Sequence, residues 1–272
     1  MKILICAGKM PYAVPTVRFG GLIARLTKSS VIVLTVVGSQ AEQVAGEETL
    51  AQAREMLGEL TVETKTRRGA PAEEILAETE EGDYDLVVVG ARDVIGLTEL
   101  LLGSVARHVV NHALASVLVV KRGRPNLERL LICTGGREIA EPVIRMGARL
   151  AQAAAARATL LYVVSPVPSM YTGLKALEET LSELLQTDTP AARHLRHGAE
   201  ILDQYGVKAE LELRHGVVAD EILREAHQGD YDLIVIGTGV GGNRLKGLLM
   251  EDVTGHIVDH ALRPVLVVQP QG

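Results

Sequence analysis

The sequence contains an internal repeat that runs through nearly its whole length. The segments beginning at Ile5 and Ile132 align without a gap. About a third of the aligned positions are identical, including Cys6/Cys133, Gly8/Gly135, Pro15/Pro142, Arg18/Arg145 and Gly20/Gly147. Further on, GAPAEEILAETEEGDYDLVVVG (69–90) matches GVVADEILREAHQGDYDLIVIG (216–237), with GDYDL unchanged. Such self-similarity indicates a duplicated domain. We therefore predict two domains, 1–124 and 127–272, each of a size that folds on its own.

Each half alternates apolar strands with amphipathic helices. In the first half the predicted strands are KILIC, VIVLTVV, TVETKT, DLVVVG and SVLVVK. The predicted helices are Pro15–Lys28, Ala41–Glu59 with Ser39 as its cap, Pro71–Thr79 and Leu102–Ala113. This pattern predicts an α/β fold of two tandem, open, parallel five-stranded sheets, in the order 3-2-1-4-5, with helices on both faces. The final strands, SVLVVK and RPVLVVQ, are expected to pair edge to edge.

The second half carries extra residues, which we place at 166–195. Leu174, Leu177, Leu181, Leu184 and Leu185 recur there at helical spacing. This spacing predicts an additional helix or a longer helix covering the sheet, with a partner-docking surface as the alternative.

Composition excludes several functions. The net charge is −6, which argues against binding nucleic acid. We interpret Arg67-Arg68 and Lys121-Arg122-Arg124 as solvated loop charges. No segment has the length of a membrane span or the apolar core of a signal peptide, so we expect a cytoplasmic protein without membrane contact. Cys6 and Cys133 are expected to be buried thiols, and a disulfide between them is the alternative.

A ligand-binding edge is expected where the strand order reverses, between the first and fourth strands. Gly8 and Gly90 stand at the ends of those strands. Gly103 and Ser104 open the following helix, whose unpaired N–H groups and positive dipole end attract an anion such as phosphate.

The segment GARDVIGLTELLLGSVARHVVNHALASVLVVK (90–121) resembles the nucleotide-binding motif of the universal stress protein family, which has an adenine nucleotide alpha hydrolase-like fold. The family pattern is Gly, two residues, Gly, nine residues, then Gly-Ser or Gly-Thr. The resemblance implies a regulatory protein rather than an enzyme, binding ATP, ADP or AMP with Mg²⁺ and forming homo-oligomers. The implied nucleotide-binding residues are Ala7, Gly8, Lys9, Val36, Gly90, Arg92, Asp93, Gly103, Ser104 and Val105.

The sequence departs from that pattern at three places. Asp93 replaces the second glycine, and its charge near the phosphates would cost on the order of 1 to 3 kcal/mol unless Mg²⁺ bridges them. Gly8 and Gly135 stand where the family's nucleotide binders place an aspartate. In the second copy, Glu251 and Asp252 replace Gly103 and Ser104. We predict that this copy binds no triphosphate, because its own carboxylates accept from the free N–H groups of the helix start and complement its dipole.

Other motifs favour structural roles. His108 and His112, repeated as His256 and His260, are expected to complement a helix C-terminus, with a metal pair as the alternative. The aspartates flanking Tyr84 and Tyr231 are expected in turns at the amino ends of strands. GTGVGG (237–242) lacks the spacing of a dinucleotide motif. The alternative function is a tandem module that binds no nucleotide and acts through an unknown protein partner.

Overall fold

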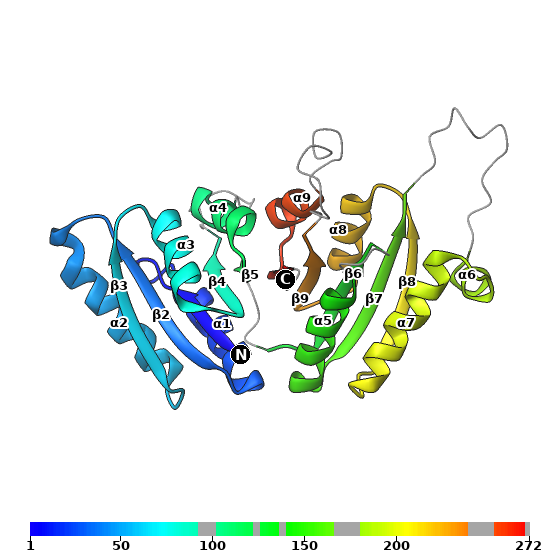
Figure 1. Cartoon of the computed structure of the whole chain (residues 1–272), viewed down its shortest axis with the longest axis horizontal. Coiled ribbons are helices and arrows are strands. Elements are labelled where there is room, and N and C mark those ends of the chain that lie inside the picture. Colours follow the sequence, from blue (N-terminus) through cyan, green and yellow to red (C-terminus); the bar gives the residue numbers. More distant parts are fainter. Residues whose placement is uncertain (92–101, 122–125, 136–139, 166–179, 239–252, 270–272) are drawn as a thin grey trace. The chain divides into compact units, whose positions relative to one another are not determined.

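A computed structural model describes residues 1–91, 102–121, 126–135, 140–165, 180–238 and 253–269. The chain forms two compact units (Figure 1). The first comprises Met1–Asn126 and Val258–Gln269, and the second comprises Leu127–Ile257. The closing segment Val258–Gln269, which the sequence analysis counts with the second copy, therefore belongs by its contacts to the first unit.

Among the described residues of the first unit, the strands follow the order β3-β2-β1-β4-β5-β10. They are β1 (Lys2–Cys6), β2 (Ser30–Val37), β3 (Val62–Arg68), β4 (Leu86–Gly90), β5 (Ser116–Val120) and β10 (Val265–Val268). The first five run parallel, in the predicted order. β10 pairs antiparallel with β5, with Val265 opposite Val119. The expected edge-to-edge pairing of the two final strands is thus confirmed.

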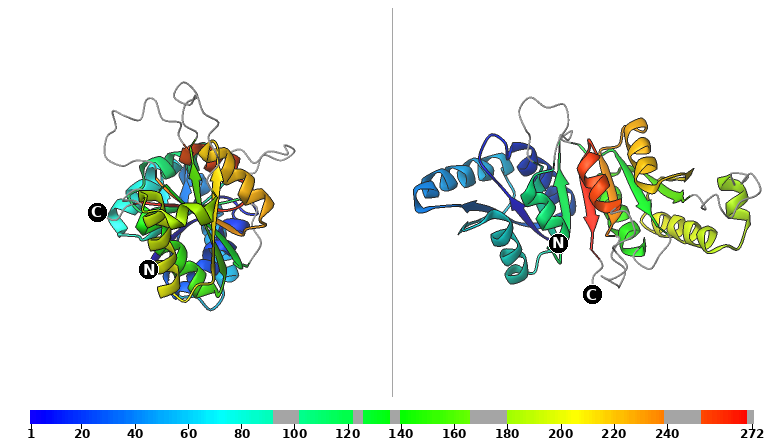
Figure 2. Two further views of the ribbon diagram at one scale, coloured as in Figure 1. Left: turned by 90° about the vertical axis from the view of Figure 1, so that its right-hand side faces the viewer. Right: turned by 90° about the horizontal axis from the view of Figure 1, so that it is seen from above.

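Helices cover both faces of each sheet (Figure 2). Those of the first unit are α1 (Val14–Thr27), α2 (Gln43–Leu57), α3 (Pro71–Gly82) and α4 (Ser104–His112). A short 3₁₀ helix, η1 (Gln40–Glu42), precedes α2. Ser39 lies before η1 and its side chain makes no capping hydrogen bond, so its predicted role as a cap is wrong. The 3₁₀ turn instead leads directly into α2.

The second unit repeats this architecture, with β9-β6-β7-β8 in place of β4-β1-β2-β3. Its strands are β6 (Arg129–Thr134), β7 (Arg157–Val164), β8 (Ala209–His215) and β9 (Leu233–Gly237), and they run parallel. Its helices include α5 (Ala140–Ala154), α6 (Leu181–Gln186), α7 (Pro190–Gln204) and α8 (Val218–Gln228). Helix α9 (Val253–His260) precedes β10.

Helix α6 is the described part of the extra segment. Thr180 caps it through a reciprocal pair of hydrogen bonds with Glu183, and it packs on α7. Leu181, Leu184 and Leu185 lie in α6, whereas Leu174 and Leu177 are outside the described residues. Within the described part of this segment, the prediction of an additional helix is confirmed.

The central strands form the core of each unit. Ile3, Leu4 and Ile5 of β1 are fully buried, as are the three corresponding residues of β6, Leu130, Leu131 and Ile132. Because successive strand residues point to opposite faces, both faces of each sheet are covered. Gly20 and Gly147 let a helix approach these strands, since a Cβ would come within 2.8 Å of Ile5 and 2.5 Å of Ile132. No helix in the described ranges has the length and apolar character needed to cross a bilayer.

Candidate functional site

The predicted binding edge lies at the carboxyl ends of β1 and β4. β1 pairs with β2 on one side and with β4 on the other, so the strand order reverses at this point. Parallel strands place their carboxyl ends at one edge, where doubly wound sheets bind ligands. Ala7, Gly8 and Lys9 follow β1. Val36 is the second-last residue of β2, and Gly90 is the last residue of β4. Topology therefore brings these five predicted residues to the same edge.

Helix α4 begins without a side-chain cap. Gly103 is its N-cap in an extended conformation, and it makes no side-chain capping hydrogen bond to the first turn. Ser104 is exposed and Val105 half-buried, while Ala106, Val109 and Val110 on the other face are buried. The N–H groups and positive dipole end of such a first turn favour an anion. Arg92 and Asp93, which the sequence analysis places beside them, lie outside the described residues.

Gly90 is required by the packing of α1. A Cβ at Gly90 would lie 2.4 Å from Oγ1 of Thr16, a buried residue in the first turn of α1. The glycine therefore lets α1 lie against the end of β4. The backbone of the next residue stays in the sheet, because the Ala91 N–H donates to the Val120 carbonyl at 2.9 Å.

Gly8 and Lys9 leave the end of β1 open. A Cβ at Gly8 would meet no described atom within 4 Å. The Lys9 side chain is 79% exposed and its Nζ lies 3.6 Å from Oε1 of Glu42. The other Glu42 oxygen accepts a hydrogen bond from the Gly38 N–H at 2.8 Å, which together with Lys9 lowers the pKa of Glu42. An exposed ion pair of this kind is weak, so Lys9 is available to an anionic ligand.

In the second copy, a histidine lies over the equivalent strand end. Thr134, the counterpart of Ala7, closes β6, and its hydroxyl lies 2.5 Å from Nε2 of His194 on α7. The His194 ring is tilted against Tyr162 of β7 at a centroid distance of 6.3 Å. Burial, followed by the neighbouring His197, lowers the pKa of His194. The His194 imidazole thus lies against the end of β6 and beside Tyr162 of β7.

The start of α9 is also hydrogen-bonded to the preceding strand, β9. The Thr254 hydroxyl donates to the Gly237 carbonyl, at the end of β9, over 3.2 Å. Ala106 stands at the equivalent position of α4 and has no hydroxyl. Glu251 and Asp252, which the sequence analysis places at this helix start, lie outside the described residues.

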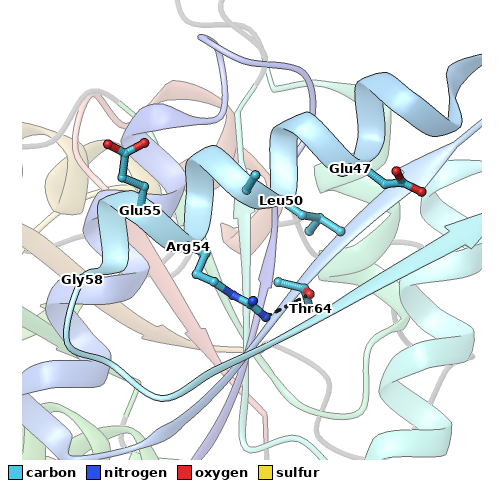
Figure 3. A pocket seen from close by; sticks show the side chains of 7 residues that line it. Glu47, Leu50, Arg54, Glu55, Gly58 and Thr64 are labelled. Atoms are coloured by element: carbon cyan, nitrogen blue, oxygen red, sulfur yellow. Dashed lines mark hydrogen bonds between the residues drawn. The ribbon is translucent and has the colours of Figure 1, made fainter.

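Two surface hollows in the described part of the chain lie elsewhere. One, of about 530 Å³, lies between α2 and β3 and is lined by Glu47, Leu50, Arg54 and Thr64 among others (Figure 3). Arg54 crosses it and donates to the Thr64 hydroxyl at 3.3 Å. The other, of about 390 Å³, includes Arg129 and Tyr231 at the amino ends of the second sheet. Neither contains a predicted site residue. We place the candidate site at the β1–β4 edge because the helix start and the strand reversal meet there.

Arg67 is not a solvated loop charge, contrary to the sequence-based interpretation. It lies on β3, and its side chain, 24% exposed, contacts Glu74, Glu78 and Glu81 of α3 at 2.8 to 3.1 Å. Glu78 is almost fully buried and also accepts hydrogen bonds from Lys65 and from the Tyr84 hydroxyl, both at 2.6 Å. The reason for the error is that the carboxylate partners lie on the next helix, one turn apart.

The second copy repeats this Glu–Tyr–Arg network. Tyr231 donates to Glu225 at 2.7 Å, and Arg214 of β8 contacts the same carboxylate. Burial, the larger cause, and the nearby glutamate raise the pKa of each cysteine thiol, Cys6 beside Glu78 and Cys133 beside Glu225. Both cysteines are free; Cys133 is buried as expected, and Cys6 only partly. Raised thiol pKa values suit inert cysteines rather than nucleophiles.

Lys121 is likewise buried rather than solvated. Only 3% of the residue is exposed, and its Nζ donates to the Asp259 carbonyl at 2.8 Å. Burial lowers the pKa of Lys121 to about 8, although the Asp259 charge acts in the opposite direction. The partner lies far along the chain, which is why sequence reasoning missed it. Arg122 and Arg124 are outside the described residues.

The aspartates near Tyr84 and Tyr231 have the turn roles predicted for them. Asp83 and Asp230 adopt left-handed conformations, each with φ 50°. Asp85 accepts from the Lys2 N–H at 2.7 Å, and Asp232 from the Glu128 N–H at 2.8 Å. His112 is the last residue of α4, as the helix-end interpretation requires. Within the described ranges no three His, Cys, Asp or Glu side chains form a group able to hold a metal ion.

Comparison with known proteins agrees with this architecture. The model of the universal stress protein family matches the chain twice, over residues 1–121 and 126–269. A universal stress protein of Methanocaldococcus jannaschii (MJ0531) is 28% identical over 151 residues, which cover 56% of this chain and 87% of that protein. Another, Slr1101 of Synechocystis, is 35% identical over 83 residues, 30% of this chain and 77% of its own length.

A solved structure extends the likeness to the whole chain. The crystal structure of a universal stress protein from Archaeoglobus fulgidus superposes with a TM-score of 0.75 and covers 98% of both chains, at 15% identity. This likeness concerns the fold alone. Taken with the two family matches, it leaves one assignment: the chain belongs to the universal stress protein family and contains two copies of that family's domain.

Proposed function

We propose that the first copy binds an adenine nucleotide, ATP, ADP or AMP, at the carboxyl edge of β1 and β4. In this proposal the chain is a regulatory binding module rather than an enzyme, and its second copy binds no nucleotide. The observation that carries it is the uncapped start of α4, where Ser104 is exposed beside an edge at which Gly8 leaves open space.

The first copy offers the groups that a nucleotide requires. The first turn of α4 supplies N–H donors and a positive dipole end for phosphate, and the Ser104 hydroxyl supplies a further donor. Lys9 is exposed, and its ion pair with Glu42 at 3.6 Å is weak, so it can turn toward a phosphate. Val36 is half-buried on β2, where its backbone and side chain suit a base. In a triphosphate complex we expect Mg²⁺ to offset the negative charge of Asp93.

The second copy has filled the equivalent positions with its own side chains. The His194 side chain, hydrogen-bonded to Thr134, lies over the end of β6. The Thr254 hydroxyl donates a hydrogen bond to the Gly237 carbonyl at the end of β9. Both interactions use residue types that the first copy lacks at the equivalent strand and helix positions, Ala7 and Ala106. A ligand entering this edge would have to break them without replacing their hydrogen bonds.

The experiment compares the purified, untagged chain with one double variant. Nucleotide released on denaturation is identified by mass spectrometry, and Tm is then measured against AMP, ADP, ATP and Mg-ATP up to millimolar concentration. Ligand at 100 times its Kd should stabilise the folded state by about 2.7 kcal/mol. G103E/S104D gives the first copy the acidic pair of the second and should abolish this response.

The matched control places the same charges at another helix start. Gln43 and Val44 open α2, and Val44 is 66% exposed, so Q43E/V44D should retain the full response. Binding that survives in G103E/S104D would move the site away from α4. If no nucleotide is released and none shifts Tm, the proposal fails, and the protein-interaction module described above replaces it. Self-association and a cytoplasmic location stay predictions, which sedimentation and cell fractionation can check.

A further inference from the structure

Two histidines form an exposed pair on α4. His108 and His112 lie four residues apart, hence on the same face of the helix, and both are exposed. Their rings stack with a centroid distance of 4.2 Å and an interplanar angle of 24°. Two imidazoles at i and i+4 can bind one metal ion, as in zinc-binding helices, once the His108 ring turns out of this stack so that one nitrogen of each ring faces the ion.

A hydrogen bond fixes the tautomer of one ring. Nδ1 of His112 lies 2.8 Å from the carbonyl oxygen of His108. Because a carbonyl oxygen only accepts, Nδ1 must carry the proton, and Nε2 of the neutral ring then holds a lone pair. Histidine ligands in metal sites are typically oriented in this way, by donating the other ring N–H to a carbonyl or carboxylate.

The electrostatic setting also favours a cation. His112 is the last residue of α4, so the ion would lie near the negative end of the helix dipole. The preceding basic residue, Arg107, is paired with Asp259 at 2.9 Å, which offsets its charge.

We propose that His108 and His112 chelate a divalent transition metal, of the class Cu²⁺, Ni²⁺ and Zn²⁺, with water in the remaining positions. Imidazole suits these ions, and Cu²⁺ should bind most tightly among them. The proposal is independent of the nucleotide, because it uses the opposite end of α4 and a face that the nucleotide does not require.

The test uses the full-length chain without an affinity tag and with CuCl₂ as the probe. H256A/H260A serves as the background, since the second copy repeats the spacing. Calorimetry gives the stoichiometry and Kd, and electron paramagnetic resonance reports the number of nitrogen ligands. The background protein should show a site with two imidazole nitrogens. Adding H108A or H112A should weaken that site by roughly 100-fold or more, because the second imidazole binds intramolecularly.

A relocated histidine provides the matched control. Leu114 is 80% exposed just beyond α4, so H112A/L114H keeps the number of histidines while it removes the spacing of four. This variant should lose the two-nitrogen signal as fully as H108A/H112A. Circular dichroism verifies that each variant is folded. A Kd and resonance spectrum unchanged in H108A/H112A, or retained in H112A/L114H, would overturn the proposal.

Discussion

The Tyr84 hydroxyl should contribute measurably to stability, and the chain contains its own reference for the effect. Tyr84 is 6% exposed and donates to Glu78 at 2.6 Å. A hydrogen bond to a charged group contributes about 1.5 to 3 kcal/mol. Glu78 keeps Lys65 and Arg67 as donors in Y84F, so we expect the lower end, about 1.5 kcal/mol. That loss corresponds to a fall in Tm of about 3 to 6 °C.

Two further tyrosines calibrate the same change. Tyr12 is 58% exposed, and Y12F should alter the free energy of unfolding by less than about 0.5 kcal/mol. Tyr231 is 2% exposed, donates to Glu225 and also lies 3.0 Å from the Thr159 hydroxyl, so Y231F should cost at least as much as Y84F. Urea denaturation followed by circular dichroism measures all three. If Y84F and Y12F unfold at the same urea concentration, the network is not a stabilising one.

The same network predicts acid sensitivity. Burial acts to raise the pKa of Glu78, but the hydrogen bonds from Lys65, Tyr84 and Arg67 outweigh it and lower the pKa below 4.5. A carboxylate whose pKa is lower in the folded state stabilises that state above its unfolded pKa, and this contribution is lost as the pH falls. The stability difference between the parental chain and Y84F should therefore narrow below about pH 4.5.

Two other changes test the edge and the buried lysine. G90A should destabilise the first unit by about 1 to 3 kcal/mol, because the new methyl group would lie 2.4 Å from the Thr16 hydroxyl, and adding T16A should recover most of the loss in urea denaturation. If G90A/T16A does not regain this stability, the backbone conformation at Gly90, and not the contact with Thr16, is what requires glycine. Burial lowers the pKa of Lys121 from 10.5 to about 8, so the unfolded chain binds more protons between these values and stability should rise with pH across that interval. K121M should flatten the rise in Tm between pH 8 and pH 10.5; an unchanged slope would show that Lys121 is solvated.

Local sequence signals predicted the elements and their order, whereas long-range pairing decided the errors. The apolar runs of β1, β4 and β5 and the proline at the start of α3 are properties of neighbouring residues, and each was found in place. Arg67 and Lys121 were misread because their partners lie on other elements. Which charged side chains contact one another is decided by the three-dimensional fold.

The candidate site shows the same contrast between what local sequence predicts and what long-range contacts decide. Its position follows from strand order, which the repeat and the alternation of elements already predict. The Thr134–His194 contact in the second copy did not follow, since His194 lies 60 residues along the chain on a helix whose rotation no pattern specified. A histidine on the buried side of an amphipathic helix was the available signal, and it could not identify the strand end beneath it.

The pairing of β10 with β5 has a consequence for how the chain matures. During synthesis, residues 1–126 leave the ribosome with the outer edge of β5 bare, and Val265–Val268, which will cover it, are made only after the second copy. An uncovered strand edge invites pairing with other chains. A copy expressed by itself, or a chain cut short before residue 258, would keep that edge permanently and should recruit a second molecule in place of its missing tail.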